Sequence, residues 1–234
     1  MSIKIWHIAT HTANIGDGAL VNGIQTTLKQ DLEEEIQFHN DCLMYYENYW
    51  GNKKYDQELV DQINEEADLL IIGGGGMMDG RRSRKHTGIG FDLPLNLFEQ
   101  IKIPIVFYAL GFNLFKGQFF WNKPALVKLL QFAARRKDCL FSVRNDLSQK
   151  RLQELVGVDT ARCVIEIPDP GLYVETKPTH HAEFSESNPN ILIQLAGDNT
   201  SARYNQSTVA RLPFVSNRIA KIEKNVNLSQ SRRP

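Results

Sequence analysis

The chain alternates short apolar runs with segments of helical period. The apolar runs predict five β-strands, at 3–8, 68–72, 103–110, 140–143 and 163–167. Each run is followed by Gly, Asn, Asp or Arg, where a strand can end. The runs at 68–72 and 103–110 have no polar alternation, which is typical of parallel strands covered on both faces.

Helical segments lie between these strands. Leu20, Ile24 and Leu28 recur every four residues and predict a helix over about 18–32. Similar patterns predict helices over 55–66, over 126–133 with Pro124 near the start, and over 147–155 with Asn145 or Asp146 as the cap. The alternation predicts an α/β fold with a doubly wound, mostly parallel sheet.

The composition changes near residue 175 and divides the chain. Residues 1–174 are predicted to form a Rossmann-like α/β domain, and the polar, proline-bearing stretch 175–189 a linker. A strand at 190–196 and a helix at 215–226 then begin a second α/β domain over 190–234. One strand and one helix bury too little surface to fold alone, so we expect this piece to dock on the first domain or to belong to a longer design.

Charge and cysteine content exclude several classes of protein. Basic and acidic side chains number 27 each, which argues against a chain that coats nucleic acid. The longest apolar stretch, 103–112, is about half of what a bilayer crossing needs. The N-terminus lacks the long apolar region of a signal peptide, and we expect a cytoplasmic protein. Cys42, Cys139 and Cys163 are unpaired in the sequence and predict buried thiols, with no disulfide framework or zinc site.

The first strand is followed by a loop with candidate ligand-binding residues. In an open parallel sheet, ligands bind beyond the carboxyl ends of the strands. Asn14, Gly16 and Asp17 stand there at the start of a helix, whose free N–H groups favour an anion or a hydroxyl-rich ligand. Capping of the helix explains Asn14 and Asp17 equally well.

Four consecutive glycines, 73–76, end the second predicted strand. Gly74, Gly75 and Gly76 are candidates for close backbone approach to a substrate, and tight turn packing is the structural alternative. A GxGxxG reading places Met78 or Asp79 at the third glycine, and the P-loop pattern does not occur. The glycines therefore give no nucleotide-binding fingerprint.

Arg144 ends an apolar strand and directs a planar, five-donor group toward the predicted crevice. It suits a phosphate or a carboxylate, or else a salt bridge to Asp146 or Asp169. Asp169 lies between two prolines and is a candidate base, hydroxyl ligand or orienter of Arg144. Asn113 follows the third strand as a further substrate-binding candidate.

Other polar residues carry weaker signals. The basic stretch 81–86 is either a mobile lid over an anionic substrate or a solvated loop. The histidines show no metal-ligand spacing, and we expect no metal site. No GxSxG motif occurs, so a hydrolase with a serine nucleophile is not supported.

Five motifs in order resemble the polysaccharide pyruvyl transferase family. They are NIGDGAL at 14–20, DLLIIGGGG at 68–76, PIVFYALGF at 104–112, FSVRNDLS at 141–148 and IPDPGL at 167–172. The resemblance implies a two-domain fold like that of the GT-B glycosyltransferases. It also implies transfer of a carboxyethylidene (pyruvyl) group from phosphoenolpyruvate to two hydroxyls of a sugar, giving a ketal in exopolysaccharide or cell-wall synthesis. No cofactor is implied.

The resemblance also assigns roles to residues. It implies that Arg144 binds the donor and that Asn14, Asp17 and the glycines line the acceptor side. Asn145 stands where the family motif commonly has aspartate. The family's second-domain arginine and histidine have no counterpart before Pro234, so we expect a chain truncated in that domain.

Two other functions remain open at this level. One is a GT-B glycosyltransferase that uses a sugar nucleotide. The other is a truncated, non-catalytic domain that binds a glycan or a partner protein. The partners implied by the leading hypothesis are a small-molecule donor and a sugar or polysaccharide acceptor. The sequence gives no oligomeric state.

Overall fold

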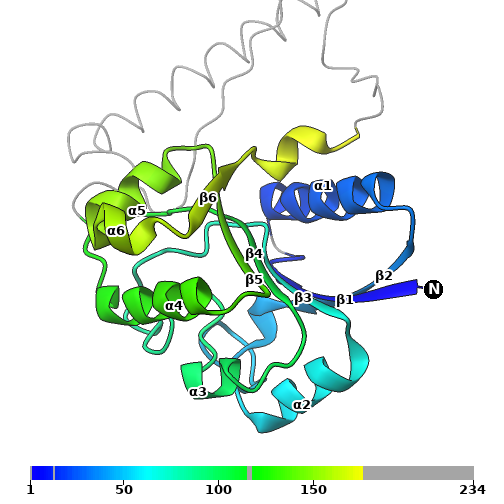
Figure 1. The fold of residues 1–234 in the computed structure, drawn as a ribbon, viewed down its shortest axis with the longest axis horizontal. Helices are drawn as coiled ribbons and strands as arrows, with labels where there is room; N and C mark the ends of the chain where they lie inside the picture. Colours follow the sequence, from blue (N-terminus) through cyan, green and yellow to red (C-terminus); the bar gives the residue numbers. More distant parts are fainter. Residues whose placement is uncertain (1, 13, 115–117, 176–234) are drawn as a thin grey trace, which may run out of the picture. The chain divides into compact units, whose positions relative to one another are not determined.

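The computed structural model describes residues 2–12, 14–114 and 118–175 (Figure 1). The predicted linker beyond residue 175 and the predicted second domain lie outside these residues.

Six parallel strands form one sheet in the order β2-β1-β3-β4-β5-β6. This architecture confirms the predicted α/β fold with a parallel sheet, and all five predicted strands are present within two residues of their expected ends. The strands are β1 (Ser2–Ala9), β2 (Glu35–Cys42), β3 (Leu69–Gly73), β4 (Ile105–Leu110), β5 (Cys139–Arg144) and β6 (Val164–Ile167).

Strand β2 was not predicted from the sequence. His39 pairs with Trp6 of β1, and their rings stack with centroids 3.7 Å apart. Strand β2 is an edge strand that pairs only with β1, and most of its side chains are at least partly exposed. Its polar residues therefore hide the apolar signal that marks the central strands.

The four predicted helices are present, with ends shifted by at most three residues from those expected. Shorter helices were not predicted because a single turn shows no period. The helices are α1 (Ile15–Asp31), α2 (Gln57–Glu66), α3 (Leu95–Phe98), α4 (Lys123–Arg135), α5 (Ser148–Val156) and α6 (Val158–Ala161), with 3₁₀ turns η1 (Leu43–Tyr45) and η2 (Pro170–Tyr173). None of these described helices is long and apolar enough to cross a bilayer.

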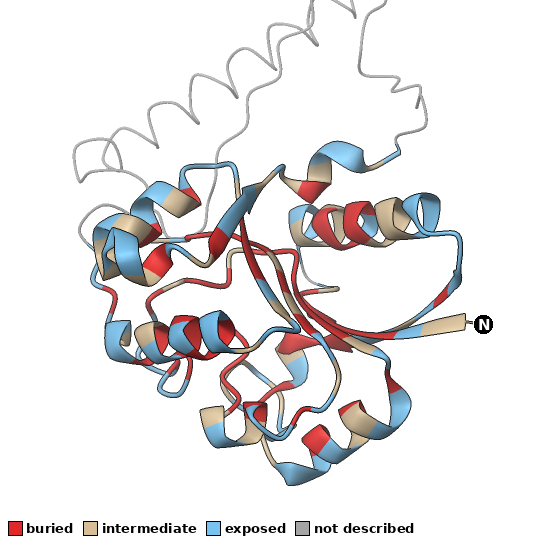
Figure 2. Cartoon of the chain, in the orientation of Figure 1, coloured by how far each residue is buried: buried red, intermediate tan, exposed pale blue. Residues whose placement is uncertain are grey.

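The sheet has a hydrophobic core on each face. Helix α1 covers one face, where Leu28 packs on a small cluster of Ile5, Ile36 and Ile71. Helices α2, α3 and α4 lie on the other side of the sheet in Figure 1, over a much larger core. Figure 2 shows the buried positions concentrated along the strands between these layers.

The strand order fixes where a ligand can bind. The chain moves from β1 to β2 on one side and then to β3 on the other, so the order reverses between β1 and β3. The connections at such a point diverge and leave a crevice at the carboxyl ends of the strands.

Candidate functional site

The loop after β1 ends at the cap of helix α1. Asn14 Oδ1 accepts a hydrogen bond from Gly16 N at 2.9 Å, so Asn14 is the N-cap. Asp17 lies half-buried in the first turn. Burial raises the pKa of the Asp17 carboxyl above 3.8, although the Arg144 guanidinium and the Asn14 side chain lower it. The Asp17 carboxylate is therefore a stronger base than an ordinary aspartate, and it lies within electrostatic reach of Arg144.

The first two of the four glycines are explained by packing. A β-carbon at Gly73 would lie 2.0 Å from the carbonyl oxygen of Tyr108 on the neighbouring strand. Gly74 has φ +91°, and a β-carbon there would meet Ile24 and Val21 of α1. The structure therefore places Gly74 against the helix, and tight packing accounts for its presence.

Gly75 and Gly76 have different surroundings. The nearest atom to a β-carbon at Gly75 would be Asp17 Oδ1, at 3.4 Å, and one at Gly76 would lie 3.0–3.3 Å from the Asn113 side chain. Gly75 therefore borders the carboxylate of α1, and Gly76 borders the exposed amide of the β4 loop. These two glycines bring the loops after β1, β3 and β4 together.

Arg144 lies flat against Gly111. A β-carbon at Gly111 would be only 2.1 Å from Arg144 Nη2, so only glycine leaves room for the guanidinium. Nη1 donates to Asp169 Oδ2 at 3.2 Å, and Nη2 is 3.0 Å from Asp146 Oδ2. The structure thus contains both salt bridges that the sequence offered as an alternative to ligand binding. The side chain is still 18% exposed, so the group is not closed off.

Asp169 contacts both Arg144 and the turn that follows β6. Its Oδ1 accepts from Gly171 N at 2.8 Å, which caps η2, while its Oδ2 faces the guanidinium. Turn η2 packs closely on α1, where a β-carbon at Gly23 would lie 1.9 Å from Pro170 O. These contacts tie Asp169 to Arg144 and to η2, and which of its three predicted roles it has stays a prediction.

The β5 loop is fixed to the β4 loop by Ser148. Ser148 Oγ accepts from Phe112 N at 2.7 Å and donates a short hydrogen bond to Asp146 Oδ1. Leu147, not Asn145 or Asp146, is the N-cap of α5, with φ +71°. Asp146 Oδ1 nevertheless accepts from Ser148 N at 3.2 Å. These bonds hold the turn after Arg144 in one conformation.

A subset of the predicted site residues therefore lies at one edge of the sheet, namely Asp17, Gly75, Gly76, Asn113, Arg144 and Asp169. Among the described residues, the carboxylates of Asp146 and Asp169 contact the Arg144 guanidinium, and that of Asp17 lies within its electrostatic reach. Arg144 Nε is buried and has no protein partner. A guanidinium has five N–H donors, so two carboxylate contacts leave capacity for a further anion.

The basic stretch 81–86 is a solvated loop, as one of the two alternatives predicted, except that Arg84 points inward. Arg84 is fully buried, with Nη1 donating to Asn48 O at 3.2 Å and its guanidinium 4.2 Å from the centre of the Tyr49 ring. Nη2 is 3.4 Å from Asp79 Oδ2. Arg84 thus anchors this loop to the β2 loop, while Arg81, Arg82, Lys85 and His86 are exposed.

A buried histidine network beside the crevice was missed. His7 is fully buried, with Nε2 3.3 Å from Gly73 O and Nδ1 3.1 Å from Gln25 Nε2. Because an amide nitrogen only donates, Nδ1 accepts and Nε2 carries the proton. Burial lowers the pKa of His7 to about 3. The presence of His7 within an apolar strand could have indicated that it is buried. Its hydrogen-bond partners, Gly73 and Gln25, lie too far away in the sequence to be predicted.

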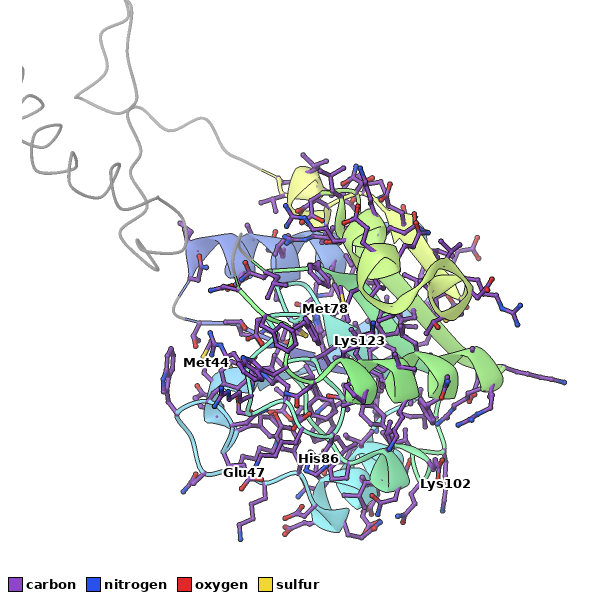
Figure 3. All side chains as sticks on the ribbon, turned by 90° about the vertical axis from the view of Figure 1, so that its left-hand side faces the viewer. Met44, Glu47, Met78, His86, Lys102 and Lys123 are labelled. Atoms are coloured by element: carbon purple, nitrogen blue, oxygen red, sulfur yellow. The ribbon has the colours of Figure 1, made fainter. Side chains whose placement is uncertain are left out.

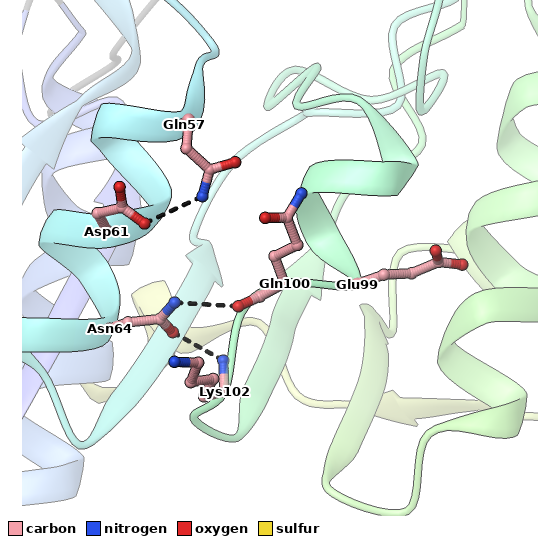
Figure 4. Close-up of a pocket in the computed structure, with 6 residues that line it drawn as sticks. All are labelled: Gln57, Asp61, Asn64, Glu99, Gln100 and Lys102. Atoms are coloured by element: carbon pink, nitrogen blue, oxygen red, sulfur yellow. Dashed lines mark hydrogen bonds between the residues drawn. The ribbon is translucent and has the colours of Figure 1, made fainter.

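Two of the hollows that the described residues form lie away from the site. One, of about 270 Å³, lies between α2 and the segment leading into β4 (Figure 4). There Asn64 accepts from Lys102 N at 2.7 Å and donates to Gln100 O at 3.0 Å. The other, of about 320 Å³, includes Glu47 and His86, labelled in Figure 3. Neither contains a predicted site residue, and the described residues include no cluster suited to a metal ion.

The fold and site define an α/β protein with polar side chains gathered beyond the carboxyl ends of its parallel strands, where proteins of this class bind their ligands. Within that class the chain belongs to the polysaccharide pyruvyl transferase family, whose profile matches residues 14–229. No curated protein matches the chain. Family membership confirms the resemblance in the motifs and gives the chain a transferase-like role in pyruvyl transfer.

Proposed function

We propose that the chain transfers a pyruvyl group from phosphoenolpyruvate to two hydroxyls of a sugar in an exopolysaccharide or cell-wall polymer or its precursor. The position of Arg144 carries this proposal. Its guanidinium lies on Gly111, within electrostatic reach of Asp17, and the side chain remains 18% exposed despite its two carboxylate contacts. Phosphate and carboxylate groups are the preferred partners of such a planar donor.

The reaction needs two proton transfers and one leaving group. Each of two hydroxyl oxygens forms a bond to C2 of the donor, and the C2–O bond to phosphate breaks. One hydroxyl proton is balanced by the proton gained at C3, which becomes a methyl group, and the other leaves with inorganic phosphate. A base near the hydroxyls and a cation near the phosphate are therefore required.

The described residues supply both groups. Arg144 holds the anionic donor, with Asp169 fixing the direction of its guanidinium. Asp17 accepts a proton from a sugar hydroxyl, because burial raises its pKa and a stronger base results. Asn14, Gly16, Gly75, Gly76 and Asn113 line the acceptor side. Within this proposal the chain acts in the cytoplasm as one half of a GT-B-like cleft, without a metal or nucleotide cofactor.

Phosphate release tests the proposal. The full chain is incubated with phosphoenolpyruvate and galactose- or mannose-containing acceptors, and inorganic phosphate is followed. We expect acceptor-dependent release that Arg144→Ala and Asp17→Asn reduce at least tenfold, while Arg136→Ala, at the opposite end of β5, leaves it unchanged. Donor binding unaffected by Arg144→Ala would refute the role of that arginine. Stabilisation by a UDP-sugar but not by phosphoenolpyruvate would favour a glycosyltransferase.

A further inference from the structure

Two exposed aromatic side chains project from the loop between β4 and α4. Phe119 is 66% exposed and Trp121 is 50% exposed, and their ring centroids are 5.0 Å apart. The Arg82 guanidinium lies 3.8 Å from the centre of the Trp121 ring. Together, Arg82, Phe119 and Trp121 form what we call the aromatic platform.

The backbone beneath the platform is anchored. Phe120, between the two exposed rings, is buried and stacks on Phe112 with centroids 5.8 Å apart. Asn122 Nδ2 donates to Arg81 O at 2.7 Å. The inward Phe120 therefore fixes the outward direction of its neighbours. A pair of large rings exposed to water on either side of a buried phenylalanine is typical of a binding surface rather than of core packing.

The platform continues from the crevice along two paired segments. Asn113 N donates to Met78 O at 2.9 Å, and a β-carbon at Gly80 would lie 3.1 Å from Phe119 O. The four residue-to-residue steps from Gly76 to Gly80 span at most about 14 Å. A ligand longer than one sugar unit at Gly76 can therefore reach the platform.

The size and chemistry of the platform fit a glycan. An aromatic side chain offers at most about 250 Å² of surface, so three side chains fall short of the roughly 800 Å² per partner in a stable protein interface. A sugar ring has an apolar C–H face that packs on an aromatic ring, and hydroxyls that accept from a guanidinium. The charge balance of the whole chain, 27 basic and 27 acidic residues, does not favour nucleic acid.

We propose that the aromatic platform binds a distal sugar unit of an oligosaccharide acceptor whose reacting unit lies at Asp17, Gly76 and Asn113. This inference rests on the proposed function, because it assigns the acceptor to that crevice. It predicts that affinity increases with acceptor length.

Calorimetric binding without phosphoenolpyruvate tests the platform. The probes are galactose and mannose and the corresponding galactan and mannan tetrasaccharides. We expect one tetrasaccharide to bind the wild-type chain about tenfold more tightly than its monosaccharide, from one or two ring contacts. Trp121→Ala should remove most of this gain, and Trp121→Phe should retain part of it. Trp50→Ala, which changes a 79% exposed tryptophan on the β2 loop, is the matched control.

Several outcomes would overturn the inference. They are equal affinity for both lengths, no binding of either glycan, or the same length dependence in Trp121→Ala as in wild type. Melting temperatures of the variants identify any loss of folding, and Trp121→Phe then remains as the informative variant. Because phosphate release is measured separately, absent turnover with intact length dependence would refute the proposed reaction and leave the platform in place.

Discussion

Replacing Asp146 by asparagine should strengthen phosphoenolpyruvate binding. The Asp146 carboxylate lies 3.0 Å from Arg144 Nη2 and competes with an incoming anion for the same guanidinium. Asparagine keeps an oxygen that can accept from Ser148 N, the contact now made at 3.2 Å. The substitution therefore removes a negative charge and leaves a group of the same shape.

The magnitude follows from Coulomb's law. A donor anion about 3 Å from the guanidinium would lie about 6 Å from the Asp146 carboxylate. Repulsion between unit charges at that distance is about 0.7 kcal/mol in water and about 3 kcal/mol at an effective dielectric constant of 20. Because the Asp146 side chain is 40% exposed, we take about 1 kcal/mol. The expected gain in affinity is five- to tenfold.

Isothermal titration with phosphoenolpyruvate at low and high salt measures the effect. The gain should shrink as salt increases, because exposed charges are screened. Asp138→Asn is the control, since Asp138 pairs with Arg136 at 2.7 Å where β5 begins, remote from the crevice, and its loss should leave donor affinity unchanged. Weaker binding by Asp146→Asn in a normally stable chain would refute the reasoning, because Asp146 would then position Arg144 rather than compete for it.

Two further predictions concern Gly111 and His7. Gly111→Ala would place a β-carbon 2.1 Å from Arg144 Nη2 and displace the guanidinium, so titration should show at least tenfold weaker donor binding. Gly18→Ala is the control, because a β-carbon at Gly18 would have no other atom within 4 Å. Equal donor affinity of the two variants would contradict the role of Gly111. Since burial lowers the pKa of His7 from 6.5 to about 3, only the unfolded chain takes up this proton between those values, and stability should fall below pH 6.5 by up to about 1.4 kcal/mol per pH unit. Urea unfolding should show a shallower dependence in His7→Gln, and an unchanged slope would argue that His7 is charged in the fold.

The central strands could be predicted from the sequence because both of their faces are buried. Ile71 and Phe107, on neighbouring strands, are almost fully buried and belong to continuous apolar runs. Strand β2 was not predicted because it pairs with β1 through backbone groups, and this pairing does not require apolar side chains. A pattern of apolar residues thus identifies strands whose side chains are buried. It misses a paired strand whose side chains are exposed.

The site was predictable to the level of its loops. In a parallel sheet, Arg144 and Asp169 must lie at the same edge, since each follows a strand, and the structure joins them at 3.2 Å. The sequence could not show which of the four glycines are needed for packing and which border the crevice. That distinction depends on their contacts with Tyr108, Ile24 and Asn113, which lie far away in the sequence. The burial of Arg84 likewise depends on Asn48, 36 residues earlier.

The crevice is assembled from five separate strand ends, with residues of the loops after β1, β3, β4, β5 and β6 facing one another. If one of these strands were unpaired, the loop that follows it would not contribute to the site. A ligand bound at the site therefore stabilises the state in which all five strands are paired. Ligand binding should therefore slow amide hydrogen exchange in β1, β3, β4, β5 and β6 together, as one cooperative unit, and protection of only one strand pair is not expected.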